Sequence, residues 1–170
     1  GGGTGNHVLN MVRHWDRAAW DVSIVSTAPR TTHVLPAVPV VHLPPLARPR
    51  KFPFVQLRRF DQIRKLVRRI RRDVIHSYFF WPIVYARLLK RAGLVRHVIE
   101  NREDEGFGWG SSDYALLRLT HRAPDAIICV SDGVRRVVLE REAEDEQRVR
   151  VVHNGIEPGE PREGARQAIR

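Results

Sequence analysis

The sequence predicts a doubly wound, Rossmann-like α/β fold, in which helices cover both faces of a parallel sheet. Short apolar runs alternate with longer segments whose apolar residues recur at helical spacing. A glycine-rich segment precedes the first such helix, and polar turns follow several of the apolar runs. The 170 residues suffice for one domain with a sizeable core, and the 42% hydrophobic content argues against wholesale disorder.

The first part of the chain is expected to hold two helices and three strands. A glycine-rich loop over residues 1–5 leads into a helix over 6–18. The longest helix spans 54–72, with apolar residues on one face and arginines on the other, and it follows a basic, irregular link over 44–53. The expected strands are 22–26, 38–43 and 73–76.

The second part of the chain continues the alternation. A helix over 83–92 ends at Gly93, a strand covers 95–99, a polar loop covers 101–112, and a helix covers 113–122. Residues 125–158 then predict a β–α–β unit. Its strands are 126–130 and 149–152, and Ser131 and Asp132 are candidates for the helix N-cap.

Residues 1–158 are interpreted as one domain and residues 159–170 as the start of a connection to a second. Asn154 and Gly155 mark the expected domain exit. A glycine loop that feeds a helix normally follows a strand, so the first strand is expected to precede Gly1. The chain is accordingly interpreted as a fragment cut at both ends.

The composition and the motifs of the chain exclude several kinds of site and several classes of protein. Cys129 is the only cysteine, which excludes an internal disulfide and a cysteine-rich zinc site. No apolar run approaches the roughly 18 residues of a membrane span. No histidine pair has metal-ligand spacing, and neither a Walker loop nor a Gly-x-Ser-x-Gly elbow is present. The net charge of +10, mostly arginine, favours anionic partners.

Candidate binding residues lie in the glycine loop and where strands end, because ligands of open α/β sheets bind at the carboxyl ends of the strands. Each has an ordinary alternative: a tight turn for helix packing, a histidine satisfied by a neighbouring loop, a solvated loop or a helix cap. The candidates are Gly2, Gly3, Thr4, His76, Tyr78, Glu100, Arg102 and Ser131.

The arginine face of the 54–72 helix is a candidate for docking onto an anionic membrane through Arg64, Arg68, Arg69 and Arg72. A plain solvated face is the alternative. Nucleic acid is disfavoured, because no recognised binding module is present.

Five stretches together resemble the N-terminal domain of a family 4 glycosyltransferase, a retaining enzyme of the GT-B fold. They are GGGTGNHVLNMVRHW, DVIHSY, VRHVIENRE, CVSDGVRR and RVRVVHNGIEP, in the family's order over nearly the whole chain. The last two are the most specific.

The resemblance implies two Rossmann-like domains facing each other across a cleft, with the acceptor mostly on this domain. The donor would be a nucleotide-diphosphate sugar and the acceptor a hydroxyl of a sugar, lipid or glycan, with no cofactor and no metal required. Gly2 and Gly3 would lie against the donor diphosphate or the acceptor. His76 matches the first histidine of a His-x-His pattern whose second position is Tyr78 here, and Arg102 stands about where many members carry a histidine.

The catalytic groups would mostly belong to the second domain, so the catalytic residues stay unknown and the fragment alone is expected to be inactive. A cytoplasmic location is implied, with peripheral attachment to the inner face of the cell membrane as an option. The alternative is a non-catalytic Rossmann-like module that binds a nucleotide or nucleic acid through its basic face. A downstream α/β domain would discriminate between the two.

Overall fold

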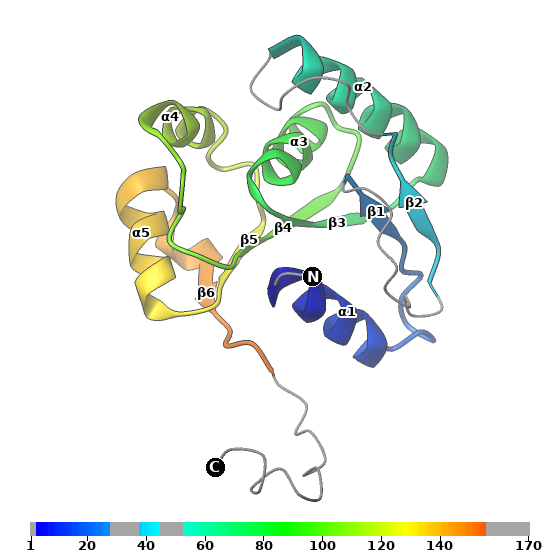
Figure 1. Ribbon diagram of the computed structural model, residues 1–170, viewed down its shortest axis with the longest axis horizontal. Helices are drawn as coiled ribbons and strands as arrows, with labels where there is room; N and C mark the ends of the chain where they lie inside the picture. The colour runs from blue at the N-terminus through cyan, green and yellow to red at the C-terminus, as the bar shows by residue number, and fades with distance from the viewer. Residues whose placement is uncertain (1–2, 28–37, 45–52, 156–170) are drawn as a thin grey trace, which may run out of the picture.

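The computed structural model describes residues 3–27, 38–44 and 53–155, which form two parallel sheets with helices around them (Figure 1). The smaller sheet pairs β1 (Ile24–Ser26) with β2 (Val40–His42). The larger sheet has the order β3–β4–β5–β6, all parallel. Its strands are Val74–Tyr78, His97–Arg102, Ala126–Cys129 and Val149–Val151. The predicted α/β class with parallel strands is confirmed, although the described strands form two sheets instead of one.

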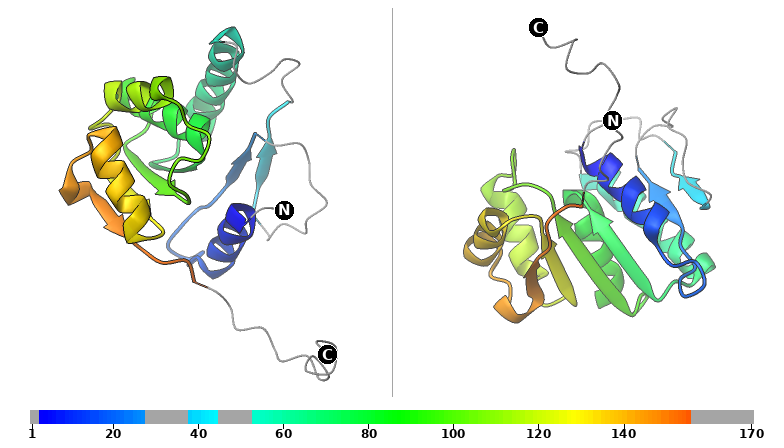
Figure 2. Two further views of the ribbon diagram at one scale, coloured as in Figure 1. Left: turned by 60° about the vertical axis from the view of Figure 1, so that its left-hand side comes forward. Right: turned by 90° about the horizontal axis from the view of Figure 1, so that it is seen from below.

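The helices lie on both faces of the larger sheet. They are α1 (Gly3–His14), α2 (Pro53–Ile70), α3 (Phe80–Arg91), α4 (Ser111–Leu119) and α5 (Asp132–Glu142), with a 3-10 turn at Glu146–Arg148. In Figures 1 and 2, α1 lies across the face of β3 and β4 that is turned away from α2 and α3. This arrangement leaves α1 beside the carboxyl ends of the strands, where ligands bind in such sheets.

The core follows from the apolar faces that the sequence predicts. Val67 of α2, Leu89 of α3 and Val98 of β4 pack in one cluster. A second cluster joins β5, α5 and β6, and a third joins α3 to α4. The predicted β–α–β unit is confirmed, with Ser131 as the N-cap residue of α5.

The ends of β3 and β4 were predicted wrongly, because their last residues are polar. β3 continues to Tyr78 and β4 to Arg102, so the expected loop over 101–112 begins inside a strand. The added residues pair in register, with Tyr78 opposite Asn101. Side chains along a strand alternate between faces. Asn101 and Arg102, which were expected to lie together in one loop, therefore point to opposite faces of the sheet.

The first helix also differs from the prediction. It begins at Gly3 instead of Asn6 and ends at His14, so Gly3 and Thr4 lie in its first turn. Gly2 lies outside the described residues. α3 begins at Phe80 and not at Ile83 as predicted. Pro82 does not prevent the earlier start, because proline is tolerated in the first turn of a helix.

Candidate functional site

A cleft of about 370 Å³ lies between α1 and the carboxyl ends of the larger sheet. Its walls come from α1, from β3, β4 and β5, and from the segment that follows β6. Four histidines and three asparagines are among its lining residues: His7, His14, His76, His153, Asn10, Asn101 and Asn154. Such a concave site with convergent polar groups is where a ligand is expected to bind.

A chain of hydrogen bonds starts at His76 in this cleft. The Nε2 atom of His76 lies 3.0 Å from the Oδ1 atom of Asn101, and the Nδ2 atom of Asn101 donates to Oε1 of Glu103 at 2.6 Å. Because the amide nitrogen of Asn101 donates to the carboxylate, its oxygen must accept the hydrogen on Nε2 of His76. That pairing fixes the tautomer of a neutral His76, with Nδ1 as the acceptor.

The carboxylate of Glu103 connects this chain to two further walls of the cleft. Asn154 donates to its Oε2 atom at 3.4 Å, and Nε2 of His7 lies 4.0 Å from its Oε1 atom. Residues that lie far apart in the sequence are thus brought together around one carboxylate. An ionised carboxylate accepts hydrogen bonds, so this group can bind ligand hydroxyls.

Two rings complete this wall. The ring of Tyr78 stacks on that of His76 with centroids 4.8 Å apart, and its hydroxyl donates to the sulfur of Met11 at 3.4 Å. Burial lowers the pKa of His76, against the opposing effect of its bond to Asn101. Burial and the charge of Glu103 raise the pKa of Tyr78. Both side chains are therefore neutral near pH 7.

The stretch from Glu100 to Glu103 was interpreted from the sequence as favouring a site, but only Glu100 and Arg102 were selected as candidates, and His7 was not singled out. The spacing of His7, Met11 and His14 along one helix face was a usable signal. The Asn101 signal was hidden, because ending β4 at Ile99 concealed the alternation that turns Asn101 toward the cleft.

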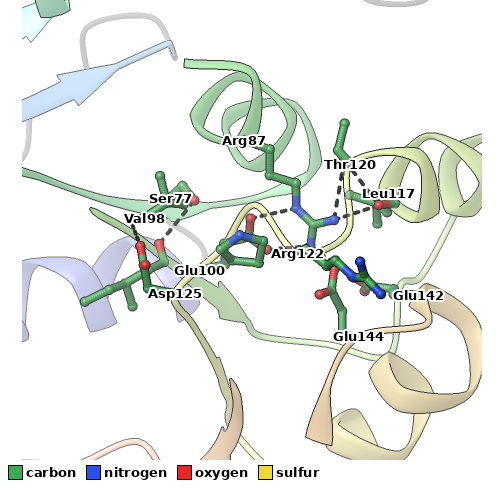
Figure 3. A network of polar contacts seen from close by, with 12 residues as sticks. Ser77, Arg87, Val98, Glu100, Leu117, Thr120, Arg122, Asp125, Glu142 and Glu144 are labelled. Atoms are coloured by element: carbon green, nitrogen blue, oxygen red, sulfur yellow. Dashed lines mark hydrogen bonds and ion pairs between the residues drawn. The ribbon is translucent and has the colours of Figure 1, made fainter. Parts of the chain in front are cut away.

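Glu100 lies on the opposite face of β4, in a buried ionic network with Arg87 of α3 and with Glu142 and Glu144 (Figure 3). Arg102 lies on the same face of β4 and joins this network through Glu100 and Glu142. Glu100 is 0% exposed and Arg102 is 2% exposed. Arg87 binds Glu100 through two parallel hydrogen bonds of 2.7 and 2.8 Å. Arg102 binds Glu142 in the same way, at 3.0 and 2.6 Å. The structure does not bring these two predicted residues to the cleft, so a binding role for them stays a prediction.

The network contains two guanidinium groups and three carboxylates. Burial alone would lower the pKa of Arg102, but the charges of Glu142 and Glu100 raise it. Burial raises the pKa of Glu144, and the charge of Arg87 only partly opposes that effect. The two guanidinium groups are therefore fully charged, and burial favours the protonated form of Glu144.

Some of the other predicted site residues line the cleft and others do not. Thr4 and Gly3 are not among the cleft's lining residues, although the first-turn N–H groups of α1 lack helical partners and suit an anion. The hydroxyl of Ser131 accepts from the backbone of Val134 at 3.3 Å. Asn154 and Gly155 do line the cleft. Within residues 3–27, 38–44 and 53–155, no cluster of side chains could hold a metal ion.

The basic face of α2 is only partly available. Arg64 is paired with Asp61 at 2.5 Å. Arg72 was predicted within this helix, but α2 ends at Ile70, and Arg72 beyond it is paired with Asp21. Arg68 and Arg69 are exposed. Among the described helices, none is long and apolar enough to cross a membrane.

Comparisons with known proteins agree with this picture. The sequence model of Glycosyltransferase Family 4 matches residues 1–160. HepE from Anabaena, in a complex with UDP and glucose, is similar in structure, with a TM-score of 0.51 and 12% identity over 71% of this chain and 32% of that chain. The chain thus spans about a third of HepE's length.

Sucrose-phosphate synthase from Thermosynechococcus elongatus is also similar, with a TM-score of 0.63 and 14% identity over 89% of this chain and 84% of that chain. At these identities the two structures establish the fold. No curated protein matches the sequence.

Proposed function

The chain belongs to Glycosyltransferase Family 4, and from that premise we propose that it forms the acceptor side of an enzyme that transfers a sugar from a nucleotide-diphosphate sugar to an acceptor hydroxyl. The observation that carries the proposal is the chain of hydrogen bonds that runs from His76 and Asn101 in the cleft to Glu103. HepE, a structural relative, has been seen with UDP-glucose. Residues 1–158 would form this domain, and residues 159–170 would connect it to another.

In the proposed reaction the bond from the sugar's anomeric carbon to the diphosphate breaks, the acceptor oxygen bonds to that carbon with retention of configuration, and the hydroxyl proton passes to the leaving diphosphate. The transition state resembles an oxocarbenium ion. The carboxylate of Glu103 and the Nδ1 atom of His76 would orient the acceptor by accepting hydrogen bonds from its hydroxyls. The first-turn N–H groups of α1, at Gly3 and Thr4, with Gly2 before them, would stabilise charge on the leaving diphosphate.

Replacing Asn101 with leucine is expected to lower kcat by about 100-fold, because it removes the bonds that orient His76 and Glu103. Leucine has the same branched outline as asparagine but no hydrogen-bonding groups, and the helix side of β4 is untouched. The measurement is release of the nucleoside diphosphate by the full-length protein, with a panel of sugar nucleotides and acceptors. His121→Ala, at an exposed site beyond α4, serves as control.

An Asn101→Leu variant with the wild-type kcat would contradict the assigned site. Binding of a sugar nucleotide without any transfer by the full-length protein would favour the non-catalytic alternative. The isolated chain is expected to transfer no sugar, because the groups that hold the donor would lie mostly outside it.

We also propose that α2 docks on an anionic membrane, through a surface that differs from the predicted one. Arg68 and Arg69 are exposed cations, and Phe54 and Leu57 on the same helix are 81% and 63% exposed. A helix that carries exposed apolar side chains at its start and exposed cations at its end suits the boundary between lipid headgroups and acyl chains. Arg64 and Arg72 contribute less, because each has a carboxylate partner.

Reversing the charge of both Arg68 and Arg69 to glutamate is expected to weaken binding to vesicles of phosphatidylglycerol and phosphatidylcholine by roughly tenfold or more, at about 1 kcal/mol for each basic side chain. Sedimentation of the protein with the vesicles measures the effect. The control is Arg136→Glu, at an exposed position on α5. Equal binding by the double variant and the control would refute the assigned surface.

A further inference from the structure

Phe79 combines an exposed ring with a strained backbone. Its φ is 67° and its ψ is 155°, a region that is occupied almost only by glycine. The residue is 62% exposed, so burial does not account for a phenylalanine in this conformation. Strained residues of this kind cluster at ligand sites. Phe79 follows the last residue of β3 directly, at the carboxyl edge of the sheet.

A second ring is presented by the loop that follows β4, over residues 103–110. Phe107 is 86% exposed. The Oδ1 atom of Asp104 accepts hydrogen bonds from the backbone N–H groups of Gly106 and Phe107, at 2.7 and 3.2 Å. The ring of Trp109 packs against that of Phe80, with centroids 5.2 Å apart. The loop is thus tied to the start of α3 while Phe107 extends into solvent.

Both rings belong to segments that adjoin the cleft. Tyr78 and Asn101 are opposite each other in the sheet, so Phe79 and Glu103 leave the same edge just beyond them. Glu103 is the carboxylate held by Asn101 and Asn154, two residues that line the cleft. Phe79 and the loop that holds Phe107 therefore each follow a strand that carries a lining residue of the cleft, His76 in β3 and Asn101 in β4.

The charge at this carboxyl edge of the sheet favours some classes of ligand over others. Glu103, Asp104 and Glu105 are three consecutive acidic residues in a chain whose net charge is +10. Carboxylates repel phosphate and carboxylate groups but accept hydrogen bonds from hydroxyls. A sugar ring offers a face of C–H groups to an aromatic ring and a rim of hydroxyls to carboxylates, which fits both features.

We propose that Phe79, Phe107 and Glu103 form a subsite for an uncharged sugar ring of the acceptor. The inference rests on the proposed function and deepens it, because it names the acceptor class. An acceptor whose nearest unit carries a phosphate or a carboxylate is excluded from this subsite by the acidic residues. The basic surface of α2 belongs to a different element and makes no contribution to it.

The test uses the full-length protein and saturation-transfer NMR with methyl glycosides of glucose, galactose, mannose and N-acetylglucosamine. Matched glucuronides and sugar 6-phosphates serve as anionic probes. At least one neutral glycoside is expected to bind, and Phe79→Ala or Phe107→Ala is expected to weaken it by roughly tenfold. Leu119→Ala, which removes another exposed apolar side chain, is the control and is expected to bind normally.

The Phe79→Gly variant separates the effect of losing the aromatic ring from the effect of relieving the backbone strain. It should weaken binding as much as Phe79→Ala does, but with a melting temperature about 2–4 °C higher, because glycine suits this backbone. Equal binding by the phenylalanine variants and the control, or stronger binding of the anionic probes, would overturn the subsite.

The binding assay needs no donor, so the subsite and the proposed function can fail separately. Neutral glycosides that bind through Phe79 and Phe107 without being glycosylated would keep the subsite and remove the transfer function. Sugar transfer that is unaffected by Phe79→Ala and Phe107→Ala, with unchanged acceptor KM, would keep the function and remove the subsite.

Discussion

Replacing Arg87 with alanine is expected to lower the free energy of unfolding by about 3–5 kcal/mol, the usual cost of leaving buried charges without their partner. The side chain is 0% exposed. It holds both oxygens of Glu100, lies 2.8 Å from Glu144, and donates to the backbone carbonyl of Leu117 at 2.8 Å. Its loss would leave three carboxylates around Arg102 alone, with a cavity beside them.

The measurement is urea denaturation followed by circular dichroism, with Arg91→Ala as the matched control on the same helix. Arg91 is exposed and donates to the carbonyl of Leu119, so its removal should cost less than about 1 kcal/mol. The loss in the free energy of unfolding for Arg87→Lys should lie between those of the two alanine variants, since lysine keeps the charge but cannot form the two parallel hydrogen bonds. A loss for Arg87→Ala no larger than that for Arg91→Ala would show that the network contributes nothing.

Replacing Gly106 with alanine is expected to cost about 3–4 kcal/mol, from two separate causes. Its φ is 80°, and a left-handed backbone costs an L-residue about 1–2 kcal/mol. An added Cβ would also lie 2.3 Å from the hydroxyl of Tyr114 and 3.2 Å from the ring of Trp109, and such overpacking typically costs about 1–3 kcal/mol. Tyr114 is 7% exposed and its hydroxyl donates to the backbone of Glu105, so it has little room to move.

Gly108→Ala is the matched control. Gly108 has the same φ of 80°, but an added Cβ would meet nothing within 4 Å. It should therefore show the backbone cost alone, about 1–2 kcal/mol. The difference between the two variants in thermal or urea unfolding measures the steric part. Equal losses would mean that Tyr114 gives way and that the loop over 103–110 is softer than its contacts indicate.

Local signals were enough to predict the fold class and the β5–α5–β6 unit. Ala126–Cys129 is a continuous apolar run, and Ser131 caps the helix that follows, so pattern and capping agree there. The ends of β3 and β4 could not be predicted in this way, because their polar residues resemble loops. Ser77 and Glu100 continue the strands only because partners on other elements satisfy them.

The candidate site was predicted only in part for the same reason. His76 was found from its position near a strand end, and it does line the cleft. Arg102 was assigned to the cleft as well, yet its carboxylate partner Glu142 is 40 residues further along the chain. A pairing over that separation leaves no periodic signal in one sequence. The glycine loop resembled a phosphate loop, but Gly3 already belongs to α1.

The buried network has one more carboxylate than it has guanidinium groups. Folding of the chain is therefore coupled to the binding of a proton. Because burial raises the pKa of Glu144 above its ordinary value of 4.5, the folded chain binds a proton that the unfolded chain releases at the same pH. For this group, stability is fully present below pH 4.5 and is lost as the pH rises through the raised pKa. Acid unfolding usually follows the opposite rule. For this carboxylate alone, moderate acidification therefore favours the folded state, on the far side of the sheet from the cleft.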